Sequence, residues 1–453
     1  MSNNIDLKKG LSIPVSGMPD LRVKRTIVPD TVAVQPSDFK GLNARLLVRE
    51  GDKVLCGSPV LADKKNPDVL ITSPVSGTVK EVVRGDKRKL LAVLVETDDV
   101  QEYLDFGKKN ADALSKDEVK DALLKSGLWA AFIQRPYGII ADPAVEPKAI
   151  FVSAFNTAPL AVDNEFALGE EVNAIQAGVT ALSKIAKVHV SVKEGSAFAR
   201  LNNAEIHTFS SKCKHPAGNV GIQIANIDHI RKEETVWTVS LFLLACIGKL
   251  FTTGKYNVRR KVAVGGPMAI QPSYVEAVPG IALSSLRDYY GSMGSEIRFI
   301  SGDILSGKNA GENGYLGFHD SQVTLVKEGT EPELLGWARP FRFNQYSVDH
   351  TYFNWCLGWL NPKRKYDMDT NLHGGPRAFV MNDAYYAKVL PMDIFPLYLV
   401  KACIAGDIDN MEKYGIYEVL PEDLALCEFI DPSKNYIQDI IANGIDLMLK
   451  EMA

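Results

Sequence analysis

Residues 148–230 decide the fold, and they open with KAIFVSA at 148–154, an apolar run of strand length. After the polar segment FNTAPLAVDNE, apolar side chains recur at steps of three, four and three, which predicts an amphipathic helix at 172–182. A second β-rich run, AKVHVSV at 186–192, follows this helix. Strand, helix and strand within this length are typical of a parallel crossover unit.

Two more strands are predicted after this unit, AEIHTFS at 204–210 and VGIQIANI at 220–227. Four strands predict an open α/β sheet at the centre of the chain, and such sheets bind ligands at the carboxyl ends of their strands. The first strand ends at Ala154, and the FNTA that follows has no glycine to let backbone amides approach a pyrophosphate. GxGxxG occurs nowhere in the chain, so NAD or flavin binding by this fingerprint is unsupported and a scaffold role for the sheet is favoured.

The composition places the chain among ordinary globular proteins. Its 453 residues are enough for about three or four domains, and 46% hydrophobic with 23% charged residues argues against disorder. The net charge of -4 argues against a nucleic-acid partner, which would require a basic domain or stripe. The opening MSNNIDLKKG lacks the apolar core of a signal peptide, so we expect the chain in the cytosol.

Metal centres and membrane spans are not predicted. The six cysteines form no CxxC or CxxxC pair, the spacing that locally built metal and iron–sulfur sites use, so we expect reduced and mostly buried thiols. The longest apolar run, VWTVSLFLLACIG at 236–248, is shorter than the roughly 20 residues that cross a bilayer and predicts a buried helix. We therefore expect any link to a membrane to come through a partner or a surface.

Residues 41–96 alternate short apolar runs with turns and predict a compact β-rich unit. The turns in VREGDKV at 48–54 and SPVSGTVKEV at 73–82 resemble those of the biotinyl/lipoyl-type hammerhead. Carrier members of that group bear their prosthetic group on a lysine at a hairpin tip, and Lys64 and Lys65 lie near such a tip. Because the residues around these lysines lack the carrier pattern, a solvated turn is favoured over a swinging arm.

A second β unit begins with RRKVAVGGP at 259–267. Downstream, Gly302, Gly307 and Lys308 have the spacing of a P-loop after a predicted strand. Asn309 stands where a hydroxyl should hold Mg²⁺, and AGENGYLG follows where the phosphate-binding helix should begin, so ATP or GTP binding is not predicted.

Helices are predicted at 111–127, where Ser115 and Glu118 form a capping box and Gly127 ends the helix, and throughout the chain after residue 391. Residues 337–366 concentrate aromatic and cationic side chains, including three of the five tryptophans. This composition predicts a partner-facing surface, although it also suits core packing.

NLHGGPRAF at 371–379 places His373 and Arg377 around a turn at Gly374 and Gly375. Two glycines allow close approach of a ligand or another backbone, so the histidine is either a functional residue or a local hydrogen bonder.

The order of these units resembles the A subunit of the Na⁺-translocating NADH:quinone oxidoreductase (Nqr complex) over nearly the whole chain. The resemblance is carried by LKKGLSIPVSG at 7–17, KLFTTGKYNVRRKVAVGGP at 249–267, RFISGDILSGKNAGENGYLGFHDSQVTLVKEGTEPELLGW at 298–337 and PMDIFPLYLVKACIAGDID at 391–409. A more distant resemblance links the chain to the C subunit of the Rnf complex and to the flavin-binding subunit of respiratory complex I. Those relatives carry a glycine-rich flavin loop and cysteine clusters in the helical tail, and this sequence has neither.

The resemblance implies four units: a biotinyl/lipoyl-like hammerhead at 1–105, a Rossmann-like α/β domain at 106–256, a β-grasp-like domain of SLBB type at 257–336, and the aromatic and basic segment with a C-terminal helical domain at 337–453. It also implies a peripheral subunit on the cytoplasmic face of the bacterial inner membrane. Electrons would pass from NADH through flavins and iron–sulfur centres of partner subunits to ubiquinone or menaquinone, with Na⁺ export.

On this resemblance the chain binds no cofactor or metal of its own, has no catalytic acid, base or nucleophile, and shares the quinone with a partner in the membrane. If the candidate residues named at the end of this paragraph do not border the quinone path, the loop at 155–160 is the next location that we expect. Two alternatives stay open: a pure assembly scaffold, and a soluble flavoenzyme on the complex I flavin-subunit fold. The candidates for the quinone site or partner interface are Trp355, Trp359, His373, Gly374, Gly375 and Arg377.

Overall fold

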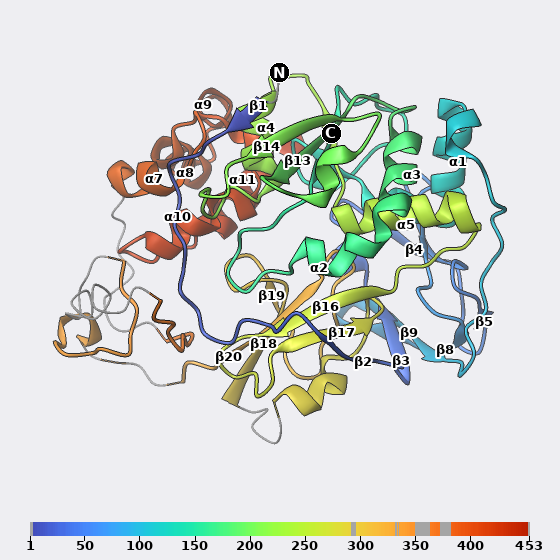
Figure 1. Cartoon of the computed structure of the whole chain (residues 1–453), viewed down its shortest axis with the longest axis horizontal. Coiled ribbons are helices and arrows are strands. Elements are labelled where there is room, and N and C mark those ends of the chain that lie inside the picture. The colour runs from blue at the N-terminus through green and yellow to red at the C-terminus, as the bar shows by residue number, and fades with distance from the viewer. Residues whose placement is uncertain are drawn as a thin grey trace.

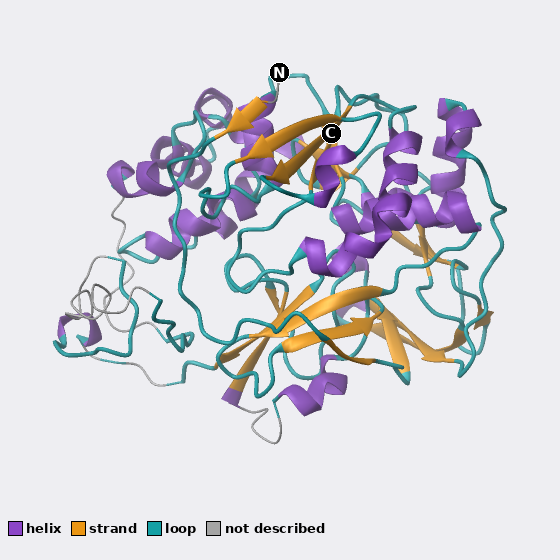
Figure 2. Cartoon of the chain, in the orientation of Figure 1, coloured by secondary structure: helices purple, strands orange, loops and turns teal. Residues whose placement is uncertain are grey.

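The computed structural model describes residues 3–290, 296–330, 333, 335–348, 363–371 and 382–451. Within these residues the chain forms a seven-stranded, a six-stranded, a four-stranded and a three-stranded sheet, followed by a helical tail (Figures 1 and 2). The architecture is therefore mixed α/β with several units, as the sequence predicts.

The seven-stranded sheet contains the predicted parallel strands and has the order β1-β14-β13-β12-β15-β10-β11. Its first five strands in this order run parallel, β10 runs antiparallel to β15, and β11 runs antiparallel to β10. The strands are β1 (Asn3–Ile5), β14 (Glu205–Phe209), β13 (Val188–Lys193), β12 (Ile150–Ser153), β15 (Val236–Thr238), β10 (Ile133–Arg135) and β11 (Ile139–Ile140). Aliphatic residues on both faces of the central strands are buried, which explains their near-continuous apolar sequences.

Helices cover both faces of this sheet. The predicted helix at 172–182 is α3 (Val172–Leu182), and it packs closely against α5 (Leu241–Thr253) (Figure 1). At their contact, a Cβ added to Gly248 would lie 1.7 Å from a backbone oxygen of α3, so only glycine fits. α4 (Val220–Ile227) packs with Ala149 and Phe151.

Two predictions about these elements are wrong. The predicted strand at 220–227 is the helix α4. Its apolar residues fit both a two-residue and a helical period, and Ile222 and Ile224 are both buried, so periodicity alone could not decide. The predicted helix at 236–248 begins only at Leu241, because residues 236–238 form β15 and the hydroxyl of Ser240 caps α5 by accepting from Leu243 N at 3.2 Å.

The second β unit is the six-stranded sheet, with the order β19-β18-β20-β16-β17-β2. The GxxxxGK segment forms the turn between two antiparallel strands, and Lys308 Nζ donates to Ser37 Oγ at 3.3 Å. It is therefore not the strand-to-helix loop that cradles a phosphate. The strands are β19 (Lys308–Asn309), β18 (Ile297–Ser301), β20 (Gln322–Lys327), β16 (Arg260–Gly265), β17 (Ser273–Ala277) and β2 (Val23–Thr26).

The two smaller sheets form the predicted β-rich unit, which begins with β3 and so before the predicted range of 41–96. Lys64 and Lys65 follow β6 at a hairpin and are exposed. The four-stranded sheet contains β3 (Thr31–Val34), β9 (Leu90–Thr97), β8 (Gly77–Arg84) and β5 (Lys53–Val54), and the three-stranded sheet contains β4 (Ala44–Leu46), β6 (Pro59–Asp63) and β7 (Leu70–Thr72).

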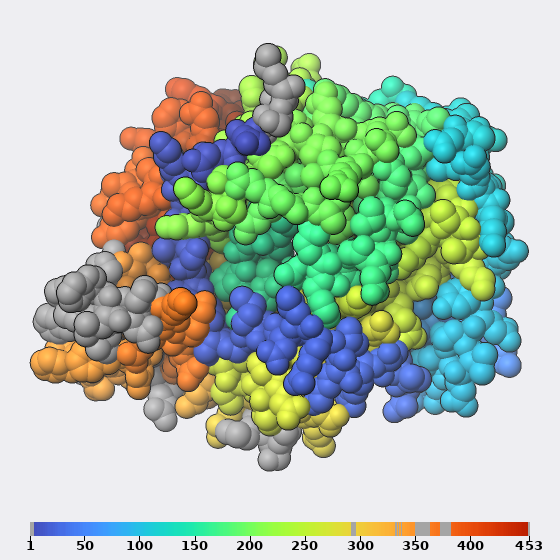
Figure 3. Space-filling model, viewed as in Figure 1, coloured from blue at the N-terminus to red at the C-terminus, as the bar shows by residue number. Residues whose placement is uncertain are grey.

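The first two strands of the chain do not join this unit. β1 pairs with β14 of the seven-stranded sheet, and β2 pairs with β17 of the six-stranded sheet. Figure 3 shows this N-terminal segment in blue, running across the surface over the central unit in green and the second β unit in yellow. It thus ties the two large sheets together.

The predicted capping box of Ser115 and Glu118 is present at α1 (Lys116–Ser126), and the helical tail is confirmed. No helix in the described part of the chain is long and apolar enough to cross a membrane. The tail contains α7 (Asp383–Val389), α8 (Pro396–Ala405), α9 (Ile408–Tyr414), α10 (Ala425–Ile430) and α11 (Ile437–Glu451).

Candidate functional site

The predicted quinone-site residues cannot be placed. Trp355 and Trp359 fall within 349–362, and His373, Gly374, Gly375 and Arg377 fall within 372–381, so all six lie outside the described residues. They stay predictions. The second predicted location, the loop at 155–160, is described and borders a cavity of about 400 Å³.

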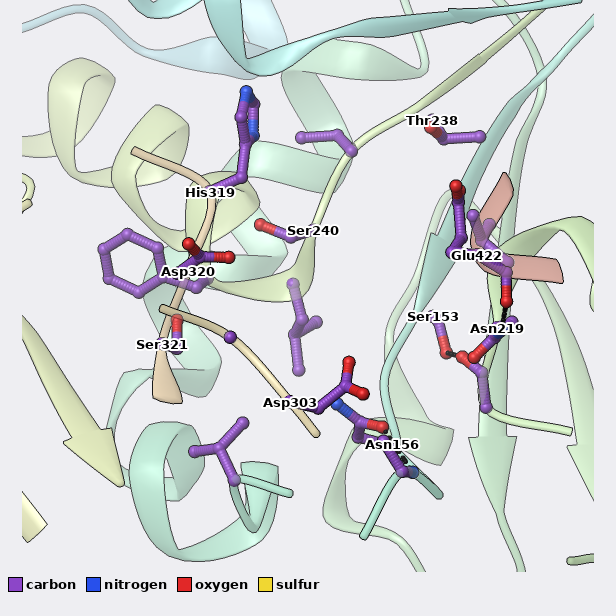
Figure 4. A pocket seen from close by; sticks show the side chains of 18 of the residues that line it. Ser153, Asn156, Asn219, Thr238, Ser240, Asp303, His319, Asp320, Ser321 and Glu422 are labelled. Atoms are coloured by element: carbon purple, nitrogen blue, oxygen red, sulfur yellow. Dashed lines mark hydrogen bonds between the residues drawn. The ribbon is translucent and has the colours of Figure 1, made fainter. Parts of the chain in front are cut away.

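This cavity lies where β12 and β15 end, at the point where the sheet order changes direction. β12 is followed in sequence by its neighbour β13 on one side, whereas its neighbour on the other side, β15, comes much later in the chain. The loops that leave such a pair diverge and open a crevice at the carboxyl ends of the strands. We call this space the switch-point cavity; Figure 4 shows residues from several separate elements around it.

Its walls come from distant parts of the chain. The starts of α4 and α5, the loop after β18, the loop before β20 and the segment at 420–422 all contribute. Phe155 and Phe242 supply aromatic rings, and Asn156, Ser240 and Gln322 supply polar groups. The site is thus assembled from the seven-stranded sheet, the six-stranded sheet and the helical tail together.

A buried ion pair joins the tail to the cavity wall. Arg135 Nη1 donates to Asp423 Oδ2 at 2.7 Å, and Nη2 donates to Glu422 Oε1 at 2.8 Å. The side chains of Arg135 and Asp423 are 2% and 0% exposed, whereas that of Glu422 is 40% exposed. Burial acts to lower the pKa of Arg135, but the two carboxylates outweigh it and raise the pKa above its usual value, so the guanidinium stays charged.

This pair occupies the start of α4. A Cβ on Gly221 would lie 2.2 Å from Asp423 Oδ2 and 2.3 Å from Arg135 Nη1. The N-terminus of a helix is where dinucleotide folds hold a phosphate, because its free amides and dipole favour negative charge. In those folds the helix in question follows the first strand of the unit, whereas α4 follows β14. The carboxylate of Asp423 at the start of α4 disfavours an anion at that helix end.

A second arginine fixes the wall that carries His319 and Asp320. Arg260 donates to the carbonyl oxygens of Asp320 and Phe318, both at 2.9 Å, and its guanidinium lies 4.0 Å from the ring centroid of Phe242. Burial lowers the pKa of Arg260 to about 10, so the group remains a cation at neutral pH. It holds the loop and one aromatic wall in place.

The two titratable side chains on this loop are shifted toward their neutral forms. Burial lowers the pKa of His319 to about 4, and its Nε2 has no hydrogen-bond partner among the described residues. Burial also raises the pKa of Asp320, which accepts from Ser301 Oγ at 2.6 Å. At neutral pH His319 therefore presents an uncharged imidazole.

The charge of the described wall decides which ligands fit. Arg135 is its only lysine or arginine, and that cation is already paired with two carboxylates. The acidic side chains at the wall are Asp303, Asp320 and Glu422. A phosphate would meet carboxylates without a free cation, so the described wall suits an uncharged ligand better than an anionic one.

Sequence reasoning identified the loop at 155–160 but missed Arg135, Asp423, Arg260 and His319. The segment containing His319 carries part of the family resemblance, yet the resemblance gives that histidine no role. Arg135 and Asp423 lie 288 positions apart, and no local pattern joins residues at such a distance. The only indication of this pair in the sequence is that a charged residue, Arg135, ends an apolar segment.

Comparison with known proteins assigns the chain. Family models described as the NqrA N-terminal barrel-sandwich hybrid domain, the NqrA second alpha/beta domain and the NQRA C-terminal domain match residues 5–98, 114–256 and 261–312. The A subunit of the Na(+)-translocating NADH-quinone reductase of Yersinia pestis bv. Antiqua (strain Angola) is 36% identical over 435 residues, covering 95% of this chain and 96% of the relative. The protein of the same name from Haemophilus influenzae (strain 86-028NP) is 36% identical over 455 residues, covering 99% and 100%. A barrel-sandwich domain at the N-terminus followed by α/β units and helices agrees with these matches, and the chain belongs to the NqrA family, the A subunits of the Na⁺-translocating NADH-quinone reductase.

Proposed function

We propose that this chain is a peripheral subunit on the cytoplasmic face of a bacterial inner-membrane complex that couples NADH:quinone reduction to Na⁺ export, and that the switch-point cavity takes the quinone headgroup. The observation that carries the second part is the position and lining of that cavity. It lies at the strand ends where α/β sheets bind ligands, and it borders the loop at 155–160. Membership of the family supports the first part.

The lining matches the chemistry of a quinone. A quinone headgroup is flat and uncharged with two carbonyl acceptors, so its site needs flat apolar walls and a few donors. Phe155 and Phe242 are buried aromatic walls. Asn156 uses its Oδ1 to accept from Ala158 N, and Ser240 Oγ accepts from Leu243 N. Among the described residues nothing accepts from the amide hydrogens of Asn156 or the hydroxyl hydrogen of Ser240, so these can donate to a ligand.

The apolar tail of the quinone needs a route into lipid, and in this proposal a membrane subunit supplies it. The aromatic and basic segment at 337–366, with Trp355 and Trp359, would border that route together with His373 and Arg377. Flavins, iron–sulfur centres and the NADH site would belong to partner subunits. The absence of GxGxxG supports this division.

We also propose that the seven-stranded sheet is a Rossmann-like unit that no longer binds a nucleotide, and that the six-stranded sheet is β-grasp-like. The order β14-β13-β12-β15 supports the first assignment, since it has the 3-2-1-4 pattern of a doubly wound sheet. Mixed pairing around β20 and β16 supports the second.

Filling the cavity tests the proposal. Ala158 lines the cavity and contributes only a methyl group, so Ala158→Trp places an indole in the space for the headgroup. The matched control is Ala113→Trp, at an exposed position that does not line the cavity. In the assembled complex, Ala158→Trp should abolish quinone reduction while NADH oxidation with an artificial acceptor continues.

The alternatives give different results. A pure assembly scaffold predicts normal quinone reduction by an assembled Ala158→Trp complex. A soluble flavoenzyme predicts stoichiometric flavin in the purified chain, which we expect to be colourless. If His373→Ala or Arg377→Ala lowers quinone reduction and Ala158→Trp does not, the headgroup binds at the predicted segment and not in the cavity.

A further inference from the structure

Two histidines and a glutamate converge on one face of the seven-stranded sheet, away from the switch-point cavity. His189 is the second residue of β13, and Glu205 and His207 are the first and third residues of β14. The parallel register sets His189 opposite Glu205 and Ser191 opposite His207. Because alternate residues of a strand share a face, all three side chains lie on the same side of the sheet.

The ligating atoms of these side chains are close together. His189 Nδ1 lies 2.8 Å from His207 Nε2 and 3.4 Å from Glu205 Oε2, and all three atoms lie within 4.8 Å of one another. Both histidines are buried, and His189 stacks on Phe151 with ring centroids 4.7 Å apart. Strand pairing and stacking thus fix the direction of each ring before any ligand is present.

The protonation states suit a metal ion. Burial, assisted by the neighbouring His207, lowers the pKa of His189 to about 4, and burial also lowers the pKa of His207. Lys187 Nζ lies 2.8 Å from Glu205 Oε1 and lowers the pKa of that carboxyl, so the carboxylate is ionised. At neutral pH the group therefore has two neutral imidazoles and one carboxylate, the forms that bind a metal.

We propose that His189, Glu205 and His207 bind a divalent transition-metal ion of the Zn²⁺ class. Tetrahedral Zn²⁺ with Zn–N distances of 2.0–2.1 Å places neighbouring ligand atoms about 3.3 Å apart. The separation of His189 Nδ1 from Glu205 Oε2 is already close to this value, and the two ring nitrogens need to separate by only about 0.5 Å. The proton now shared between those nitrogens moves to the outer nitrogen of its own ring, so both rings stay neutral.

The position of the site indicates its role. The cluster lies at the amino ends of β13 and β14, whereas the cavity lies at the carboxyl ends of the strands. The Glu205 side chain is 51% exposed, so solvent reaches the ion and water supplies the fourth ligand. The ion would join two neighbouring strands of the central sheet and stabilise them without taking part in electron transfer. Cysteine spacing could not reveal it, because its ligands come from two strands.

Cobalt(II) titration of the purified full-length chain, stripped with a chelator beforehand, tests the site. We expect one equivalent of Co²⁺ to give the visible absorption bands of tetrahedral coordination, and one equivalent of Zn²⁺ to displace it and raise the Tm. Glu205→Gln and His207→Gln should each weaken binding by more than about tenfold, since even loss of an outer-shell partner costs 10- to 100-fold. His229→Gln, which changes an exposed histidine outside the cluster, should bind as the unchanged chain does.

Because the Glu205 side chain is half-exposed, Glu205→Gln should fold even if His207→Gln, which changes a buried side chain, does not. No saturable Co²⁺ binding by the unchanged chain would show that the two histidines form only a hydrogen-bonded pair, and would overturn the proposal. Unaltered stoichiometric binding in both Glu205→Gln and His207→Gln would overturn it as well.

Discussion

Replacing Arg135 by methionine should destabilise the chain by about 3–4 kcal/mol. Removing one partner of a buried ion pair costs about 3–5 kcal/mol, because the remaining charge is buried without compensation. Asp423 is 0% exposed and would be that charge. It would keep its bond from Leu420 N at 3.0 Å and its place at the start of α4, which puts the cost at the lower end. Glu422 is 40% exposed, so its lost partner adds at most about 1 kcal/mol.

The assay is urea unfolding of the purified chain followed by circular dichroism. A second change, Asp423→Asn, removes the stranded charge, so Arg135→Met with Asp423→Asn should recover about 2 kcal/mol relative to Arg135→Met alone. Lys125→Met is the control, because Lys125 pairs with Asp121 at the surface and its loss should cost less than about 0.5 kcal/mol. A double variant less stable than Arg135→Met alone would refute the reasoning.

Three further predictions concern other parts of the fold. Gly248→Ala should lower the free energy of unfolding, measured in urea, by about 1–3 kcal/mol or more, because its Cβ would lie 1.7 Å from a carbonyl oxygen of α3. Gly169→Ala is the control and should be tolerated, because Gly169 has open space around it. Burial lowers the pKa of His215 to about 4 in the folded chain, so stability present above pH 6.5 should be lost as the pH falls toward 4, by up to about 3 kcal/mol. His215→Gln should flatten that dependence; an unchanged slope would contradict the assignment. Intact mass should show no biotinyl or lipoyl group on Lys64 or Lys65, and a mass excess lost on changing either lysine to arginine would contradict this.

The sequence predicted the elements that have one dominant pattern. The strands around residues 150 and 188 are apolar runs, the capping box of Ser115 and Glu118 is a local signature, and all were placed correctly. The segment at 220–227 carries apolar residues that suit two periods, and only its packing on β12 decides for a helix. β1 and β2 were not predicted because they are three and four residues long and mostly polar.

The candidate site was predictable only in part. The loop at 155–160 could be found because ligands bind at strand ends, a rule that needs only the order of strands and helices. The remaining walls come from loops near His319 and Glu422, which meet the sheet through contacts far apart in the sequence. Arg260 and Arg135 fix those walls from buried positions, and no residue near either arginine in the sequence indicates its role.

The N-terminal segment has a consequence for folding during synthesis. Asn3 pairs with His207, and Val23 pairs with Tyr274, so both strands leave the ribosome long before their partners exist. At 5–20 residues per second, the first strand waits roughly 10 to 40 s. Its sequence, NNI, and the VKRT of β2 are polar enough to wait in water without aggregating. The β-rich unit formed by the two smaller sheets follows β2 in the chain and has time to fold first. The two large sheets are joined only when synthesis has passed both partner strands.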